Sequence, residues 1–280
     1  MQLAIVAFPS PVHENPDPST LRILFLGDVV GEPGRKAAMA FLPDIRARRG
    51  VDFSIVNGEN AAGGRGITPK ICIGLLRAGA AVVTSGDHIW DQPEILEYIK
   101  GEPRLLRPAN FPPGVPGAGS IVLQSPKGKV AVANVLGRTF TQPTIDNPFT
   151  VLDGEVARLR AETPIIFVDV HAETTSEKIA IARMLDGRVS AVIGTHTHVQ
   201  TADEQIFAGG TAFLCDAGMC GPVESILGRQ MDPIIGRFLT GLPARFPVAK
   251  GPVRICGVLV DIDVESGEAR GIERVSQIVE

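Results

Sequence analysis

The feature that most constrains the fold of this chain is an alternation of short apolar strands and helices joined by short connections. Strands are expected over residues 21–26, 53–56 and 81–84, and helices over about 35–49, 69–78 and 93–100. This β-α-β-α-β-α order predicts an α/β fold whose strands are largely parallel and joined by right-handed crossovers.

The remaining two thirds of the chain continue with both element types. After a stretch rich in proline and glycine over 108–119, two strands over 121–123 and 129–135 are expected around a turn at 126–128. Further strands are expected over 165–168, 189–193, 211–214, 253–262 and 271–278, and further helices over 152–161, 176–185 and 231–240. Because no linker or internal repeat divides the sequence, we expect a single domain over 21–280, preceded by a flexible leader over 1–20.

Composition excludes several classes of protein. Of the 280 residues, 44% are hydrophobic and 21% are charged, which is typical of globular proteins, and the net charge of −4 argues against binding of extended nucleic acid. No apolar run approaches the ~18 residues that cross a membrane. The cysteines show no Cys-x-x-Cys spacing, so we expect reduced, buried thiols in a cytoplasmic protein; they are Cys72, Cys215, Cys220 and Cys256.

Two of the five histidines lie in the segment Gly194-Thr195-His196-Thr197-His198, directly after an expected strand. In extended backbone, residues two apart point to the same side, so His196 and His198 could serve one metal each of a close pair or one metal together. The alternative is that both are loop histidines held by ordinary hydrogen bonds.

Metal-capable side chains follow five separate strands. They are Asp28, Glu59 with Asn60, Asp87 with His88, His171, and His196 with His198. Carboxylate, amide and imidazole ligands in this mixture suit divalent transition ions, and two ions ~3.5–4 Å apart can clamp both oxygens of a phosphoryl displacement. Strand-end Asp and Asn also cap helices. Four of the chain's five histidines lie at such strand ends, and this coincidence favours the metal hypothesis.

The order of these motifs resembles that of the calcineurin-like metallophosphoesterases, and more closely the bacterial YmdB-like branch. The matching segments are 27–31, 57–64, 86–88, 107–110, 171–178 and 194–203. The resemblance extends from Leu21 to the C-terminus. It implies a four-layer α-β-β-α sandwich of the metallophosphoesterase type, with two metals at one sheet edge.

The resemblance also implies roles for the strand-end residues. One metal would be held by Asp28, Glu59, Asn60 and His198, and the other by Glu59, Asp87, His171 and His196. Glu59 would bridge the two, and His88 would be the proton donor. The family usually has asparagine where this chain has Asp87. An anionic ligand there should tighten the second metal and reduce its Lewis acidity.

The activity implied is hydrolysis of small phosphodiesters, in particular 2′,3′-cyclic nucleotides, by in-line attack of a hydroxide that bridges the metals. Fe or Mn is the expected metal pair, with Zn or Mg as alternatives. Arg65 and Arg107 are candidate phosphate contacts, with solvated surface arginines as the alternative. We expect a homo-oligomer with a small-molecule substrate and no membrane partner.

Two other functions are compatible with parts of the sequence. The first is a nucleotide-binding dehydrogenase, although Gly27, Gly31 and Gly34 are spaced G-x-x-x-G-x-x-G, which is not the dinucleotide fingerprint. The second is a metal-binding regulator with weak phosphatase activity. A serine hydrolase is unsupported because no G-x-S-x-G occurs. Metal content tests the first alternative, and turnover tests the second.

Overall fold

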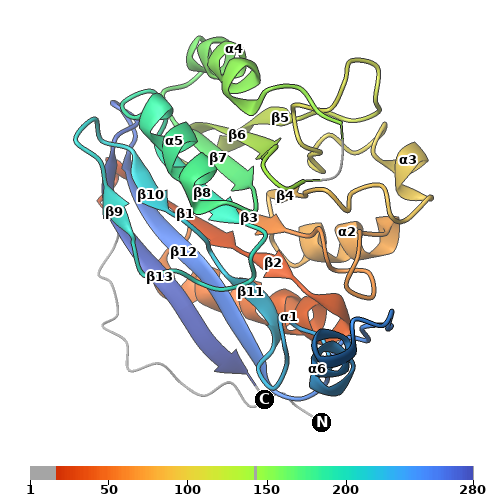
Figure 1. Cartoon of the computed structure of the whole chain (residues 1–280). Helices are drawn as coiled ribbons and strands as arrows, with labels where there is room; N and C mark the ends of the chain where they lie inside the picture. Colours follow the sequence, from red (N-terminus) through yellow and green to blue (C-terminus); the bar gives the residue numbers. More distant parts are fainter. Residues whose placement is uncertain (1–16, 142–143, 280) are drawn as a thin grey trace.

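The computed structural model describes residues 17–141 and 144–279, in which two β-sheets lie face to face between helices. Figure 1 shows the four layers. Helices α1 (Gly31–Arg49), α2 (Pro69–Arg77) and the one-turn α3 (Ile95–Tyr98) pack on the first sheet, and α4 (Pro148–Arg160) and α5 (Thr175–Leu185) pack on the second. This is the α-β-β-α sandwich expected from the sequence.

The first sheet is built from strands of the first and the last third of the chain. Its order is β2-β11-β12-β1-β3-β4, with β13 on β12. Its strands are β1 (Thr20–Leu26), β2 (Asp28–Val29), β3 (Phe53–Asn57), β4 (Val82–Thr84), β11 (Met219–Pro222), β12 (Val253–Asp263) and β13 (Ala269–Val279). β1, β3 and β4 are parallel as predicted, whereas β12 runs antiparallel to β1, β11 and β13. The sheet is therefore mixed.

The second sheet comes from the middle of the chain. Its order is β5-β6-β7-β8-β10-β9, made of β5 (Ser120–Ser125), β6 (Gly128–Leu136), β7 (Ile166–His171), β8 (Ala191–Thr195), β9 (Gln205–Ile206) and β10 (Ala212–Leu214). The four strands β6, β7, β8 and β10 are parallel, and the edge strands β5 and β9 are antiparallel to their neighbours. β5 and β6 form the predicted hairpin.

Alternate residues of each central strand enter different layers of the core. In β1, Ile23 and Phe25 pack between the sheets, whereas Leu24 and Leu26 pack under α1 and α2. The Phe25 and Phe167 rings, one from each sheet, lie 5.1 Å apart between centroids. Strands covered on both faces are apolar throughout, which explains the continuous apolar runs in the sequence.

Several helix boundaries differ from the prediction. α4 begins at Pro148 rather than 152, because the Asn147 side chain caps it by accepting a hydrogen bond from the Phe149 N–H. α1 begins at Gly31 instead of 35, and α3 is a single turn inside the predicted helix over 93–100.

The predicted leader over 1–20 lies mostly outside the described residues. Within them, Thr20 opens β1 and pairs with Asp263 of β12. The division into a leader and one domain stays a prediction. None of the described helices has the length and apolarity needed to cross a membrane. All four cysteines are free and buried, as expected.

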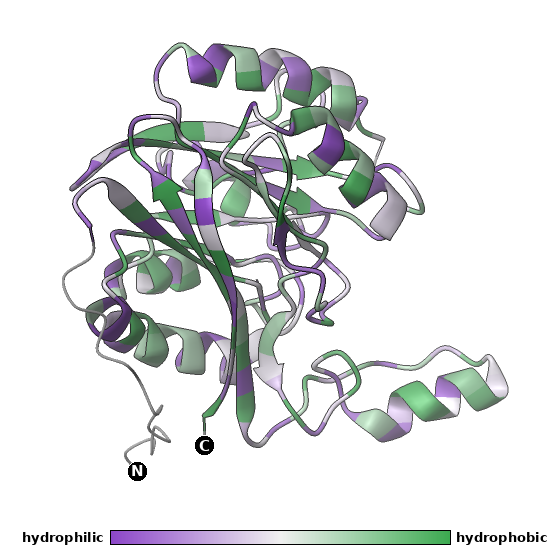
Figure 2. Cartoon of the chain, turned by 90° about the vertical axis from the view of Figure 1, so that its left-hand side faces the viewer, coloured by the Kyte–Doolittle hydropathy of each residue, from purple (hydrophilic) through white to green (hydrophobic). Residues whose placement is uncertain are grey.

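Helix α6 (Met231–Thr240) stands apart from the sandwich. It belongs to the connection between β11 and β12, and Figure 2 shows it projecting beyond the sheets. Several of its large apolar side chains are exposed; they are Met231, Ile235, Phe238 and Leu239.

Candidate metal centre

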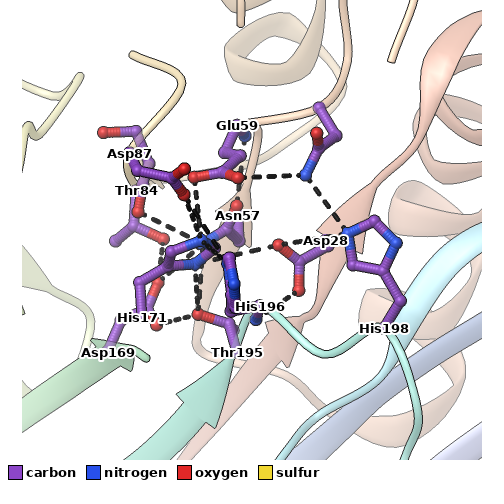
Figure 3. Close-up of polar contacts among 12 residues, drawn as sticks. Asp28, Asn57, Glu59, Thr84, Asp87, Asp169, His171, Thr195, His196 and His198 are labelled. Carbon is purple, nitrogen blue, oxygen red and sulfur yellow. Dashed lines mark hydrogen bonds and ion pairs between the residues drawn. The ribbon is translucent and has the colours of Figure 1, made fainter. Parts of the chain in front are cut away.

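The predicted strand-end residues meet where the two sheets come together at one edge, as Figure 3 shows. Asp28, Glu59, Asn60, Asp87 and His88 follow strands of the first sheet, and His171, His196 and His198 come from the ends of β7 and β8 in the second. The prediction placed these ends at the edge of a sheet, whereas the structure divides them between two sheets.

Four of these side chains form a tight cluster: Glu59, Asp87, His171 and His196. One ligand-capable atom from each lies within 4.8 Å of the others. His171 Nε2 is at the centre, 2.9 Å from Glu59 Oε2, 3.4 Å from Asp87 Oδ1 and 2.9 Å from His196 Nδ1. These are the four residues of the second predicted ligand set.

The other predicted set lies on the opposite side of Glu59. The Asn60 amide nitrogen donates to Glu59 Oε1 at 3.2 Å and to His198 Nε2 at 3.2 Å. His198 Nε2 lies 4.0 Å from Asp28 Oδ1. Glu59 is therefore the side chain shared by the two groups, which is the position of a bridging ligand.

Three buried carboxylate oxygens show what the centre is suited to hold. Asp28 Oδ1, Glu59 Oε2 and Asp87 Oδ1 are buried, and among the described residues the groups paired with them are imidazole nitrogens. A buried acceptor left unpaired costs about 1–3 kcal/mol, and more when it is charged. Three buried oxygens from three carboxylates, next to imidazole nitrogens, fit cation binding.

Hydrogen bonds fix the orientation of His171. Thr195 Oγ1 donates to Asp169 Oδ1 at 2.7 Å and lies 2.8 Å from His171 Nδ1. Because the Thr195 proton goes to Asp169, the hydroxyl oxygen accepts from His171 Nδ1–H. The Nε2 lone pair of His171 is then directed into the cluster, as a metal ligand requires.

The other two histidines are oriented in the same way. His196 Nε2 lies 3.0 Å from a carboxylate oxygen of Glu173, and its Nδ1 faces the cluster. His198 Nδ1 donates to the Leu227 carbonyl at 3.2 Å, which leaves Nε2 toward Asn60. Each imidazole thus has one nitrogen held by the protein and the other turned to the centre.

The expectation of extended backbone through His196 and His198 is wrong. Their φ angles are 99° and 65°, so β8 ends at Thr195 and a turn follows. The turn is held by Asp216, whose Oδ2 accepts from the Thr197 N–H and hydroxyl and from the buried Lys178 ammonium. The two imidazoles therefore reach opposite sides of Glu59, which favours one metal each.

Charge within the cluster perturbs its titrating groups. Burial opposes ionisation of Asp87, but the hydrogen bond and charge of His171 outweigh it and hold the pKa of Asp87 well below its usual range. Burial likewise opposes protonation of His171, yet Glu59 and Asp87 raise its pKa well above the ordinary value. Beneath them, burial raises the pKa of Asp169 to about 6, against the His171 charge. The carboxylates of the cluster thus favour a positive charge beside them.

Gly86 allows the cluster to close. A Cβ at this position would lie 1.7 Å from Glu59 Oε2 and 2.4 Å from His171 Nε2. Any side chain would therefore displace two ligand-capable residues, which explains the glycine before Asp87.

His88 lies beside the cluster and is oriented by a carboxylate. Its Nδ1 is 3.2 Å from Asp91 Oδ2, which also accepts from Arg65 Nε at 2.8 Å. Arg65 thus pairs with Asp91, and Arg107 donates to the carbonyls of Pro108, Ala109 and Pro116. The structure gives both predicted phosphate contacts other partners.

A cavity of about 380 Å³ opens on the centre. One side is lined by Glu59, Asn60, His88, His196 and His198. The opposite side is lined by seven residues that the sequence interpretation missed: Ile226, Leu227, Arg229, Ile234, Arg237, Phe238 and Phe246. The only signal in the sequence was the apolar character of the helix over 231–240, which is equally typical of a buried helix.

Comparison with known families identifies the family of this chain. The model of the YmdB-like protein family matches residues 24–275. The chain belongs to this family. A Bacillus subtilis protein named 2′,3′-cyclic-nucleotide 2′-phosphodiesterase is 49% identical to this chain over 255 residues. The matched region covers 91% of this chain and 96% of the Bacillus subtilis protein.

Two solved structures of similar proteins confirm the fold. A phosphatase from Mycoplasma pneumoniae is 34% identical with a TM-score of 0.88, over 93% of this chain and 94% of its own. A hypothetical protein from Thermus thermophilus is 40% identical with a TM-score of 0.86, over 93% of this chain and 100% of its own. Membership in the YmdB-like family leaves no support for the dehydrogenase alternative.

Proposed function

We propose that this YmdB-like chain is a metal-dependent phosphodiesterase that hydrolyses small phosphodiesters, with 2′,3′-cyclic nucleotides as its substrates. The observation that carries the proposal is the pair of ligand groups that share Glu59, with three buried carboxylate oxygens beside imidazole nitrogens. The Bacillus subtilis relative, named for cleavage of such nucleotides, supports the substrate class.

In this proposal, Asp28, Glu59, Asn60 and His198 would hold one divalent ion. Glu59, Asp87, His171 and His196 would hold the other. Ions bound there supply Lewis-acid stabilisation of phosphoryl charge and lower the pKa of the attacking water. Mixed carboxylate and imidazole ligands favour Mn or Fe, with Zn and Mg as alternatives. Thr195 and Glu173 keep the imidazoles of His171 and His196 in the ligating orientation.

His88 is proposed as the proton donor to the leaving ribose oxygen. Asp91 accepts its Nδ1 proton, so Nε2 is the nitrogen that would deliver a proton. His88 lines the cavity on the same side as Glu59 and His196, within reach of a phosphodiester seated there. The shared Asp91 contact gives Arg65 a positioning role in place of the expected phosphate contact.

The test combines metal analysis with turnover. Wild-type protein should bind about two transition ions per chain and hydrolyse 2′,3′-cyclic AMP. Glu59→Ala should lower occupancy of both sites, because the shared carboxylate is lost, and should abolish turnover. The matched control is Glu265→Ala, which removes the carboxylate of an exposed glutamate that belongs to neither ligand group. One firmly held ion that survives Glu59→Ala would exclude the dinuclear model.

The same preparation tests the regulatory alternative. A protein that retains both ions but turns over neither cyclic nucleotides nor aryl phosphodiesters would be a metal-binding regulator. A homo-oligomer remains our proposal for the assembly, and sedimentation of the metal-loaded chain would check it.

A further inference from the structure

The cavity at the metal centre has two chemically different sides. Every lining residue of the apolar side comes from one stretch of 21 residues, 226–246, whereas the opposite side is made by the strand-end residues. We refer to the seven residues at 226, 227, 229, 234, 237, 238 and 246 as the apolar wall. If the strand-end residues hold the phosphodiester group of a substrate, the rest of that substrate lies against the apolar wall.

The apolar wall exposes large side chains that the fold does not bury. Phe238 is 85% exposed and Leu227 is 47% exposed, although both line the cavity. Burying an aromatic side chain removes about 150–250 Å² from water, so an aromatic ring left open beside a reaction centre provides binding energy for a ligand. A ligand with a flat apolar face is the natural partner of such a ring.

The base of the apolar wall is anchored to the body of the molecule. Arg229 donates to the carbonyls of Gly63 and Gly64 and to that of Phe246. A Cβ on Gly64 would lie 2.2 Å from this guanidinium, so the glycine-rich loop is shaped around Arg229. The Leu227 carbonyl also accepts from His198. These contacts tie the wall to both the loop and the metal centre.

The wall has few polar side chains that could read the edge of a base. Its seven lining residues include no Asp, Glu, Asn, Gln, Ser or Thr. Of its two cations, Arg229 is engaged by carbonyls, whereas the Arg237 guanidinium, 5.9 Å from the centroid of the Phe246 ring, keeps N–H groups able to donate to a base. Recognition at the wall is therefore mainly by contact with a face.

We propose that Phe238, together with Leu227 and Phe246, binds the nucleobase of the substrate through its aromatic face. This rests on the proposed function, which places the cyclic phosphate at the metal centre. Stacking on an aromatic side chain tolerates every base, because every base has a π-face. The enzyme then requires a base, accepts all four, and favours purines for their larger stacking area.

The test compares two substrates that share the five-membered cyclic phosphodiester but differ in the base. Phe238→Ala should lower kcat/KM for 2′,3′-cyclic AMP by about 5- to 100-fold, the usual range for loss of one stacking contact. It should change kcat/KM for glycerol 1,2-cyclic phosphate by less than about twofold, since that ester lacks a base. Phe238→Tyr, which keeps the aromatic face, should restore the wild-type preference.

Leu239→Ala is the matched control. Leu239 is the next residue of α6 and is 80% exposed, but it does not line the cavity. A second readout is binding: adenosine should inhibit the wild type competitively where ribose does not, and Phe238→Ala should weaken that inhibition to the same degree as the substrate effect.

Three results would overturn the proposal. They are equal losses on the two esters, a Leu239→Ala effect equal to that of Phe238→Ala, and a wild type that prefers neither ester. If the wild type hydrolyses both esters but shows one of these results, the proposed activity stands and only the base-binding wall is wrong. If it hydrolyses neither ester, both proposals are wrong.

Discussion

At the scale of single residues, Asp87 is the position where the family resemblance leads us to expect asparagine. Its Oδ1 is buried, 3.4 Å from His171 Nε2 and 3.6 Å from His196 Nδ1. A third carboxylate thus joins Asp28 and Glu59 in one centre. The added charge favours a cation, and it also reduces the positive charge available to polarise a phosphodiester.

Asp87→Asn should therefore give an active enzyme that holds one ion less tightly, by about tenfold or more, because a unit charge is removed close to the ion. Shape and one ligand oxygen are kept. Competition with a chelator, followed by metal analysis, measures the change. Loss of all activity with both ions retained would show that Asp87 has a role other than ligation.

The role proposed for His88 depends on the leaving group. A ribose alkoxide must be protonated as it departs, whereas nitrophenolate leaves without help. His88→Ala should lose roughly 10²–10⁴-fold on a 2′,3′-cyclic nucleotide and much less on bis(p-nitrophenyl) phosphate, with metal content unchanged. Equal losses on the two substrates, with loss of metal, would mean that His88 only supports the loop beside Asp87.

At the scale of elements, the turn after β8 decides where two ligands point. Asp216 holds Thr197 by two hydrogen bonds and pairs with Lys178 of α5 at 2.8 Å, and both charged side chains are buried. Breaking a buried pair by removing one partner is far more costly than replacing both.

Asp216→Asn should accordingly lower the free energy of unfolding by about 3–5 kcal/mol, because the buried Lys178 loses its counter-charge. Combining it with Lys178→Met should recover part of this loss, since no unpaired charge remains. Urea denaturation of the metal-free proteins gives both values. Additive effects of the two changes would show that the pair is not coupled.

At the scale of the whole molecule, the centre joins two sheets that are otherwise held by an apolar core. Ligand-capable residues in β2 and after β3 and β4 face those at the ends of β7 and β8. Ions bound there stabilise only the folded state, by about 2.7 kcal/mol for an ion present at 100 times its Kd.

Chelation should lower the thermal midpoint by several degrees, since about 2–4 °C corresponds to 1 kcal/mol in domains of 150–250 residues. Calorimetry with and without added Mn measures the shift. Glu59→Ala should remove most of it, and Glu265→Ala should leave it intact. A midpoint unaffected by metal would indicate that the centre binds no ion in the folded state.

The sequence predicts most strands and the ligand-capable residues because both follow from local patterns, whereas the two-sheet sandwich was implied only by the family resemblance. Apolar runs mark β1, β3 and β7, and the polar residue after each run marks the centre. The antiparallel placement of β12 beside β1 could not be predicted, because it pairs residues more than 200 positions apart. The left-handed turn at His196 and His198 was missed for a related reason, since it depends on Asp216 and Lys178 from other elements.

The apolar wall was missed because the apolar periodicity of its helix is the same whether the apolar face is packed in the core or exposed. Asp28, Glu59 and the histidines were identified by their residue types, whereas Phe238 gains its meaning only from the cavity it faces.

The connection between β11 and β12 has an evolutionary consequence. All residues of the apolar wall lie within a single excursion from the sheets, and all metal-capable residues lie on the sandwich. Changes in the part of that excursion beyond Leu227, whose carbonyl holds His198, would alter which esters are admitted while the metal-capable residues are kept. Lineages that carry this sandwich can therefore diversify in what they degrade through changes confined to one short interval of the gene.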